Sequence, residues 1–177
     1  AFLYASVGHG GASGYLALMS LFAFPVTFMK PTALMLNILV SGISFYFYYR
    51  EKKFEWKLFY PFAITSVPFS FLGGLITIET HIYKIILATV LILAVLRLIG
   101  VFGKGSYDTK PVNLPLALLI GAIIGFLSGL IGIGGGIILS PVLLLLRWAN
   151  MKQTAAVSAL FILVNSLSGD RKSTRLN

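Results

Sequence analysis

Two glycine clusters are the parts of this sequence whose residue types and spacing could do chemistry. Gly132, Gly134, Gly135 and Gly136 form the motif GIGGG, and the motif GHGGA spans residues 8–12. Each cluster interrupts an apolar run and bares backbone N–H and C=O groups, which in an apolar environment must line a cavity or meet protein partners. A short helix after the break would also direct its free N–H groups and positive dipole end toward it, an arrangement that favours anions.

A packing role is the alternative for these clusters. Small residues let membrane helices approach closely, although three consecutive glycines exceed what a packing face needs. We favour a binding site, in which Gly8, His9, Gly10 and Gly11 are the candidate residues of the first break. His9 could hydrogen-bond a ligand or titrate near neutral pH, or it could be a loop histidine at the membrane surface.

A few polar side chains inside apolar runs are the remaining site candidates. Asn37 and Asn165 would either hydrogen-bond across helices or line a path, and Ser158 is weaker because a serine often bonds to its own helix backbone. The two histidines, His9 and His81, form no metal-binding or catalytic pattern, and there is no cysteine. We therefore predict no catalytic residue, no metal site, no cofactor and no enzymatic activity.

Composition shows which elements must position these residues. The chain has 58% hydrophobic and 11% charged residues and a mean hydropathy of +0.93, whereas soluble domains carry about 25% charged residues. The apolar segments lack the alternation of barrel strands, so they predict an all-α polytopic membrane protein that contacts the lipid bilayer. The net charge of +9 lies mainly in loops, where it sets orientation, and we predict no nucleic-acid partner.

The apolar runs give the expected helices. They cover residues 1–24, 31–49, 58–78, 82–101, 114–148 and 154–168. We expect Pro31 to open its helix, where a missing N–H costs little, which leaves Lys30 in a loop. The run 114–148 is too long for one crossing of about 20 residues. We predict a full helix of about 18 residues, a break at GIGGG and a short helix of about 12.

An internal repeat relates the two glycine clusters. GHGGA matches GIGGG, and MKPTA at residues 29–33 matches MKQTA at residues 151–155, in the same order and at nearly the same offset. The predicted parts are a first repeat whose start is missing, an inter-repeat loop, and a truncated second repeat, at residues 1–101, 102–113 and 114–169. Residues 170–177 (DRKSTRLN) read as a translated sequencing adapter, and we exclude them from fold reasoning.

The basic loop residues bear on the direction of the repeats. If the short helix does not cross the membrane, they divide six against four between the two faces. If it crosses, the division is eight against two: Arg50, Lys52, Lys53, Lys57, Lys104, Lys110, Arg147 and Lys152 against Lys30 and Lys84. The positive-inside rule favours the second division and therefore inverted repeats. However, a helix of about 12 residues reaches only about 18 Å of a hydrocarbon core about 30 Å thick.

With the repeated break in view, the chain resembles the TauE/SafE family of sulfite and organosulfur-anion exporters. The closest elements are GFLSGLIGIGGGIILSPVLLLL at residues 125–146 and, in the first copy, GHGGASGYLALM followed by KPTALMLN. The residues that match the family pattern are Gly132, Gly134, Gly135, Gly136, Pro141 and Ser158 in the second repeat and Gly8, Gly10 and Gly11 in the first. His9, Ala12 and Ala17 depart from it, which bears on the substrate more than on the family.

The resemblance implies a multi-pass permease of the bacterial inner membrane that moves a small anion such as sulfite or a sulfonate. The glycine amides and helix N-termini at the breaks would hold this substrate. Two alternatives stay open: a cation or metabolite permease that uses carbonyl oxygens at the same breaks, and a membrane assembly protein whose glycines only pack helices. The sequence also leaves open the direction of transport, the energy coupling and a homo-oligomeric assembly.

Overall fold

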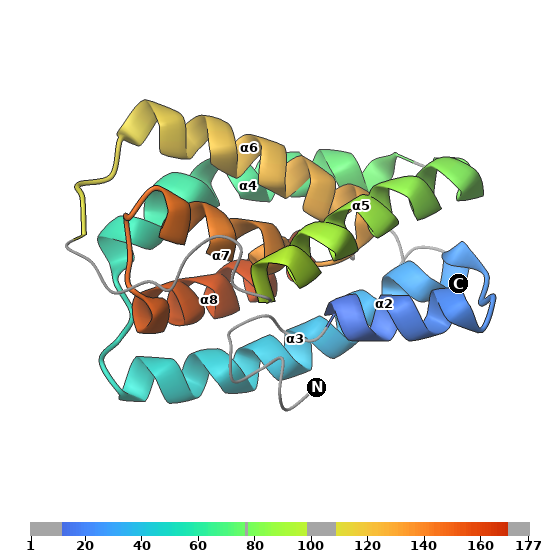
Figure 1. The fold of residues 1–177 in the computed structure, drawn as a ribbon, viewed down its shortest axis with the longest axis horizontal. Helices are drawn as coiled ribbons and strands as arrows, with labels where there is room; N and C mark the ends of the chain where they lie inside the picture. The colour runs from blue at the N-terminus through green and yellow to red at the C-terminus, as the bar shows by residue number, and fades with distance from the viewer. Residues whose placement is uncertain (1–11, 77, 99–108, 170–177) are drawn as a thin grey trace.

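Seven helices make up the described part of the chain. The computed structural model describes residues 12–76, 78–98 and 109–169, and no strand occurs among them. Figure 1 shows the helices packed side by side in one bundle. They are α2 (Ala12–Leu21), α3 (Val26–Arg50), α4 (Trp56–Leu75), α5 (Thr80–Leu98), α6 (Leu114–Ile131), α7 (Gly136–Leu145) and α8 (Met151–Gly169). The prediction of an all-α protein is confirmed.

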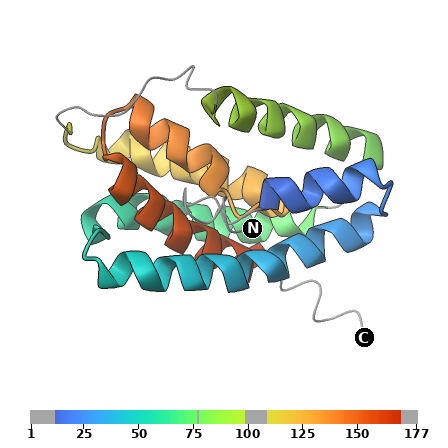
Figure 2. The ribbon, with the colours of Figure 1, turned by 60° about the horizontal axis from the view of Figure 1, so that its bottom comes forward.

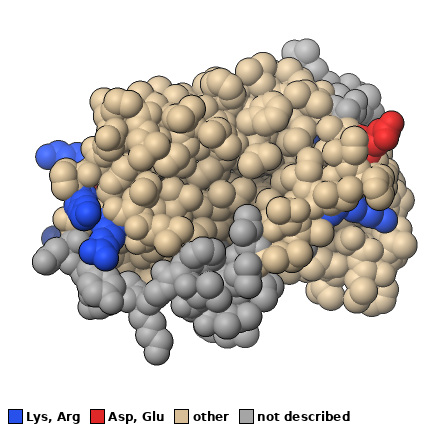
Figure 3. Space-filling view, turned by 45° about the horizontal axis from the view of Figure 1, so that its top comes forward, with Lys and Arg blue, Asp and Glu red and all other residues tan. Residues whose placement is uncertain are grey.

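Three helices are long and apolar enough to cross a membrane. They are the segment Thr27–Arg50 of α3, with 24 residues, α4 with 20 and α6 with 18, so each reaches about 27 Å or more at 1.5 Å per residue. Large apolar side chains in the middle of these helices are exposed, among them Leu39, Ile64 and Ile123. On the face in Figure 3 the charged side chains lie toward the two ends, and an uncharged band separates them. This is the surface expected of a protein in lipid.

The long apolar run 114–148 divides as predicted. Helix α6 has 18 residues and ends at Ile131, and α7 has 10 residues and begins at Gly136. Helix α7 is slightly shorter than expected because the chain turns after Leu145, where Arg147 adopts a left-handed φ of 57° and the Trp148 amide donates to the Leu143 carbonyl at 3.0 Å. The break between α6 and α7 therefore coincides with the GIGGG motif.

The start of α3 differs from the sequence expectation. The helix begins at Val26, directly after the N-cap residue Pro25, so Pro31 lies inside the helix instead of opening it. Proline in the second turn removes only the N–H that would have served the Thr27 carbonyl, and the apolar residues before it suit a helix. The expectation that Lys30 lies in a loop was therefore wrong, because Lys30 belongs to the second turn of α3.

The most extensive helix contact joins α4 and α6. Gly121, Gly125 and Gly129 recur every fourth residue along α6 and face the backbone of α4. A Cβ atom added at Gly125 would collide with the Ser66 carbonyl oxygen, and one at Gly129 with that of Ser70. This is close packing through small residues, as membrane helices use it, and it involves glycines outside the GIGGG motif.

Most of the described basic residues lie at one end of the bundle. The Lys110 amide donates to the Arg147 carbonyl at 2.7 Å, and the Gln153 side chain donates to the Glu55 carboxylate. The α7–α8 turn therefore lies beside the N-termini of α4 and α6, at the left of Figure 1. The described basic residues at this end are Arg50, Lys52, Lys53, Lys57, Lys110, Arg147 and Lys152. The division that the sequence favoured also includes Lys104, which lies outside the described residues.

The two helical hairpins of the bundle turn at opposite ends. Figures 1 and 2 both place the α2–α3 turn at one end and the α7–α8 turn at the other. Helices α3 and α8 pack against each other along the seam between the hairpins. Inverted repeats would have this arrangement, and the repeat itself stays a prediction.

Candidate functional site

The GIGGG break is a sharply turned connection that glycine alone makes without strain. Gly132 caps the C-terminus of α6 with a φ of 86°, and its amide donates to the Ser128 carbonyl at 2.8 Å. Gly134 and Gly135 have φ values of 73° and 76°. These left-handed conformations cost other residues about 1–2 kcal/mol each. Helix packing does not require them, so the break is built differently from the glycine stripe on α6.

The N-terminus of α7 opens directly onto the break. Gly135 is its N-cap residue, and the amides of Ile138 and Leu139 both donate to the Gly135 carbonyl, at 3.1 and 3.0 Å. The amides of Gly136 and Ile137 come before these first donors and have no acceptor within α7. They stand at the positive end of the helix dipole, where negative charge is stabilised.

Buried polar side chains from three helices surround the break. A Cβ atom added at Gly134 would lie 3.3 Å from Asn37 Nδ2 of α3 and 3.1 Å from Ser166 Oγ of α8. A Cβ atom added at Gly135 would lie 3.3 Å from the Cβ of Ser128 in α6. All three side chains are at most 1% exposed. The absence of a side chain at Gly134 thus brings the backbone of the break close to α3 and α8.

These three side chains have no hydrogen-bond partner in the described part of the chain. The atoms concerned are Nδ2 and Oδ1 of Asn37 and the hydroxyl oxygens of Ser128 and Ser166. Native proteins satisfy most buried polar groups, because leaving one unpaired costs about 1–3 kcal/mol. Several such groups around a helix N-terminus are therefore candidate ligand-binding groups. Their hydroxyl and amide N–H groups can donate to an oxyanion.

The other predicted site residues of α8 lie along the same helix with different roles. The Ser158 hydroxyl bonds to the Ser140 hydroxyl at 2.8 Å, which joins α8 to α7. The Asn165 carbonyl accepts from the Ser70 hydroxyl at 3.1 Å, while its side-chain amide has no partner among the described residues. Asn165 adjoins Ser166 in sequence, but no contact places its amide against Gly134. Residues 8–11, including His9, lie outside the described residues.

A cation lies at the edge of the break. A Cβ atom added at Gly132 would lie 2.8 Å from Cγ of Lys30 and 3.3 Å from the Lys30 carbonyl oxygen. The ammonium group of Lys30 donates to the Gly74 carbonyl, in the last turn of α4, at 3.4 Å. The Lys30 side chain therefore lies between the first residue of the break and the last turn of α4.

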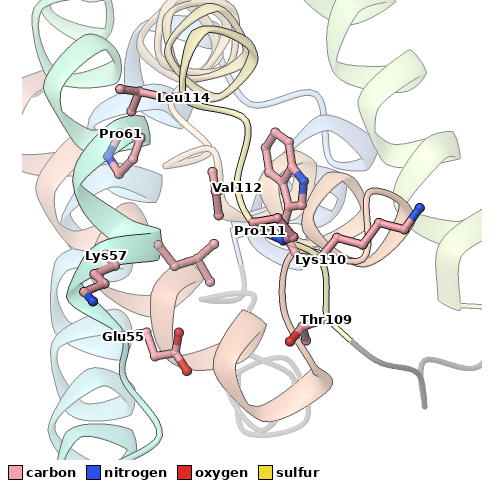
Figure 4. Close-up of a pocket in the computed structure, with 10 residues that line it drawn as sticks. Glu55, Lys57, Pro61, Thr109, Lys110, Pro111, Val112 and Leu114 are labelled. Atoms are coloured by element: carbon pink, nitrogen blue, oxygen red, sulfur yellow. The ribbon is translucent and has the colours of Figure 1, made fainter.

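A cavity of about 470 Å³ lies at the basic end of the bundle, away from the break. Figure 4 shows it between the N-terminus of α4 and the segment that precedes α6. Its wall includes Glu55, Lys57, Lys110 and Trp148. None of the predicted site residues lines it, and in Figure 4 the Lys57 and Lys110 side chains extend away from its centre. The break remains the better candidate for a binding site.

Acidic and metal-binding groups lie away from the break. The acidic residues in the described part of the chain, Glu51, Glu55 and Glu79, are outside the helices. No group of three or more His, Cys, Asp or Glu residues within the described ranges could hold a metal ion. In these ranges, the break packs against the apolar side chains of Ile124, Phe161 and Ile162, and the polar side chains that approach it are neutral except for that of Lys30.

Sequence reasoning missed three residues at the break: Lys30, Ser128 and Ser166. Lys30 was assigned to a loop because the helix start was placed at Pro31. A start after Pro25 would have put Lys30 and Asn37 seven residues apart on one helix face. Ser166 adjoins a predicted site residue, and Ser128 lies one turn before the break, but only the packing of α6, α7 and α8 shows that both side chains reach it.

Comparison with known proteins agrees with this architecture. Residues 1–169 match the family model described as "Sulfite exporter TauE/SafE". The chain is 41% identical over 170 residues to the "Probable membrane transporter protein y4hK" of Sinorhizobium fredii, covering 94% of this chain and 69% of that protein. It is 30% identical over 147 residues to the "Probable membrane transporter protein MJ0441" of Methanocaldococcus jannaschii, covering 81% of this chain and 55% of that protein. No solved structure matches. The chain therefore belongs to the TauE/SafE family of membrane permeases.

Proposed function

We propose that this chain is part of a permease for a small oxyanion, with the GIGGG break as its binding site. The description of the family model names sulfite, and we propose sulfite or an organosulfonate as the substrate. The observation that carries the proposal is the set of unpartnered, buried donors around the N-terminus of α7, which come from Asn37, Ser128 and Ser166. An oxyanion would satisfy these donors and the first amides of α7 together.

The charges around the break favour an anion over a cation. Protein sites for hard cations are built from oxygen ligands and usually include carboxylates, whereas the described acidic residues lie outside the helices. Lys30 adds a positive charge at the edge of the break. A cation at this place would be repelled by the positive end of the α7 dipole and by the ammonium group of Lys30.

We also propose that the protein spans the bacterial inner membrane several times, with its basic end in the cytoplasm. Seven described basic residues cluster at the end where α3 stops and where α4, α6 and α8 begin. Lys30 and Lys84 lie near the other end. The positive-inside rule assigns the richer end to the cytoplasm.

Flux measurements on the protein in its full natural length test the proposal. Proteoliposomes would be loaded with labelled sulfite, sulfate or an organosulfonate, with labelled rubidium as the cation control. We expect saturable flux of at least one anion. A hydrogen bond to a charged group contributes about 1.5–3 kcal/mol, so Ser166→Ala should raise KM about 10-fold or more.

The matched control for this variant is Ser44→Ala. Ser44 is also a buried serine, but its hydroxyl already donates to the Val40 carbonyl of its own helix at 2.8 Å. Its KM should therefore stay within about twofold of the wild-type value. Flux of rubidium without flux of any anion would contradict the anion site, and so would equal KM values for the two serine variants.

A further inference from the structure

The cavity at the basic end of the bundle lies where two candidate membrane spans begin. It has a volume of about 470 Å³, and its wall includes Lys57, Leu58 and Pro61 of α4 and residues of the segment 109–114 that leads into α6. Both helices are long and apolar enough to cross a membrane, so their first residues stand near the depth of the lipid headgroups. A ligand in this cavity would therefore lie at headgroup level.

The packing of α4 against α6 explains why there is space at this place. The glycines that bring the two helices together start at Gly121, where an added Cβ atom would collide with Thr65 Oγ1 and the Phe62 carbonyl oxygen. The residues of α6 before Gly121 include no glycine. The cavity lies on this N-terminal side of the close contact, with Pro61 and Leu114 in its wall.

The wall of the cavity is apolar at one end and charged at the other. Figure 4 shows Leu114 and Pro61 toward one end, and Lys57, Glu55 and Thr109 toward the other. Such a wall suits a molecule with a charged head and an apolar tail, which is the chemistry of a phospholipid. A free inorganic anion would leave the apolar end unused.

The apolar end continues onto the outer surface of both helices. Leu114 is 56% exposed, and large apolar side chains are also exposed at Leu116 of α6 and at Tyr60 and Ile64 of α4. In a membrane such side chains contact acyl chains. A lipid with its headgroup in the cavity could therefore keep its acyl chains in the bilayer.

The charged end of the cavity has an excess of positive charge. Lys57 and Lys110 are exposed, and neither forms an ion pair with a carboxylate of the described residues. The described wall holds one acidic residue, Glu55, whose carboxylate accepts from the side-chain amide of Gln153. The positive dipole ends of α4 and α6 lie at the same end of the bundle and add to the attraction for a negative group.

We propose that this cavity binds one anionic phospholipid, with Lys57 and Lys110 holding the phosphate and the acyl chains extending past Leu114. Basic pockets between membrane helices bind anionic headgroups in this way. The inference is independent of the GIGGG break, because none of the break residues lines the cavity. A lipid bound here would join the N-terminal ends of α4 and α6, where no glycine contact does so.

Lipid binding to the delipidated full-length protein in neutral detergent tests the inference. Native mass spectrometry would count bound dioleoyl phosphatidylglycerol, and dioleoyl phosphatidylcholine is the neutral lipid with the same acyl chains. We expect one phosphatidylglycerol to bind with a Kd about 10-fold or more below that of phosphatidylcholine, because each lysine near a headgroup contributes about fivefold. For the same reason, replacing both Lys57 and Lys110 by glutamine should raise the Kd about 30-fold.

The matched control replaces Lys52 and Lys53 by glutamine. Both are exposed lysines at the same end of the bundle that do not line the cavity, so the Kd should stay within about twofold of the wild-type value. Equal Kd values for the two lipids would overturn the proposal, and so would equal losses in the two double variants. Should the Lys57 and Lys110 double variant not stay monodisperse, Lys57→Gln and Lys110→Gln are measured singly, with an expected rise of about fivefold each.

Leu114→Gln and inorganic phosphate distinguish a lipid from a free anion. Leu114→Gln should raise the Kd for phosphatidylglycerol about fivefold or more, because it removes an apolar contact with the acyl chains. Excess inorganic phosphate should leave the lipid bound. Displacement of the lipid by phosphate, or a Kd that Leu114→Gln does not change, would show a site for the phosphate group alone and would overturn the lipid assignment.

Discussion

Replacing Asn37 by leucine should make the protein more stable and less active. The Asn37 side chain is fully buried, and neither Nδ2 nor Oδ1 has a hydrogen-bond partner among the described residues. Leucine has the same number and branching of side-chain heavy atoms and no polar atoms, so Asn37→Leu removes the cost of burying an unsatisfied amide. A residue kept for binding and not for packing shows this opposition between stability and activity.

The magnitude follows from the two unpartnered atoms. Leaving a buried polar group unsatisfied costs about 1–3 kcal/mol, so the ligand-free variant should gain about that much in free energy of unfolding. For a protein of about this size, 1 kcal/mol shifts Tm by about 2–4 °C. We therefore expect Tm to rise by about 2–12 °C, while loss of one amide contact to an anion raises KM about 10-fold or more.

The assay compares thermal unfolding in detergent with flux in proteoliposomes. Tryptophan fluorescence can follow the unfolding, because Trp148 is buried in the bundle. The control is Ser44→Ala, whose hydroxyl is satisfied within its own helix, and which should change neither quantity appreciably. If Asn37→Leu lowers Tm and leaves KM unchanged, the amide is a structural group and the reasoning is refuted.

Three further predictions concern the break, the packing and the orientation. Gly134→Ala should lower the free energy of unfolding by about 2–5 kcal/mol, because Gly134 has a φ of 73° and Ile162 Cγ2 would lie only 2.6 Å from the new Cβ. Gly42→Ala should raise it by about 0.5–1 kcal/mol, because the nearest atom to its new Cβ is 4.0 Å away. Thermal unfolding measures both changes. Gly125→Ala should lower Tm by the same amount with and without substrate, because its Cβ would meet the α4 backbone. A cysteine at Lys52 should react with an impermeant thiol reagent only from the cytoplasmic side.

The sequence predicted the elements that depend on local patterns. Helix α6, the break and α7 follow from an apolar run longer than one membrane crossing and from glycines that allow left-handed backbone. The grouping of Arg147 and Lys152 with Lys57 and Lys110 followed from charge segregation. Patterns of this kind lie within a few turns of chain, so they can be read without knowledge of tertiary contacts.

The predictions that failed or fell short depend on tertiary contacts. Pro31 was expected to open α3, but apolar residues before it extend the helix, and the bundle tolerates one lost hydrogen bond. The approach of Ser128 and Ser166 to the break depends on how α6, α7 and α8 pack, which no local pattern encodes. Asn37 and Asn165 looked equivalent in the sequence, yet only Asn37 has a contact that places its side chain beside Gly134.

The most direct test of the anion site is to locate a bound anion by its anomalous scattering. Crystals of the full-length protein would be soaked with selenite, the selenium analogue of sulfite, and an anomalous difference map measured at the selenium edge. The account predicts a peak within hydrogen-bond distance of the Ser166 hydroxyl and the amides of Gly136 and Ile137. A peak only in the cavity lined by Lys57 and Trp148, or no peak at the break at concentrations that saturate transport, would contradict it.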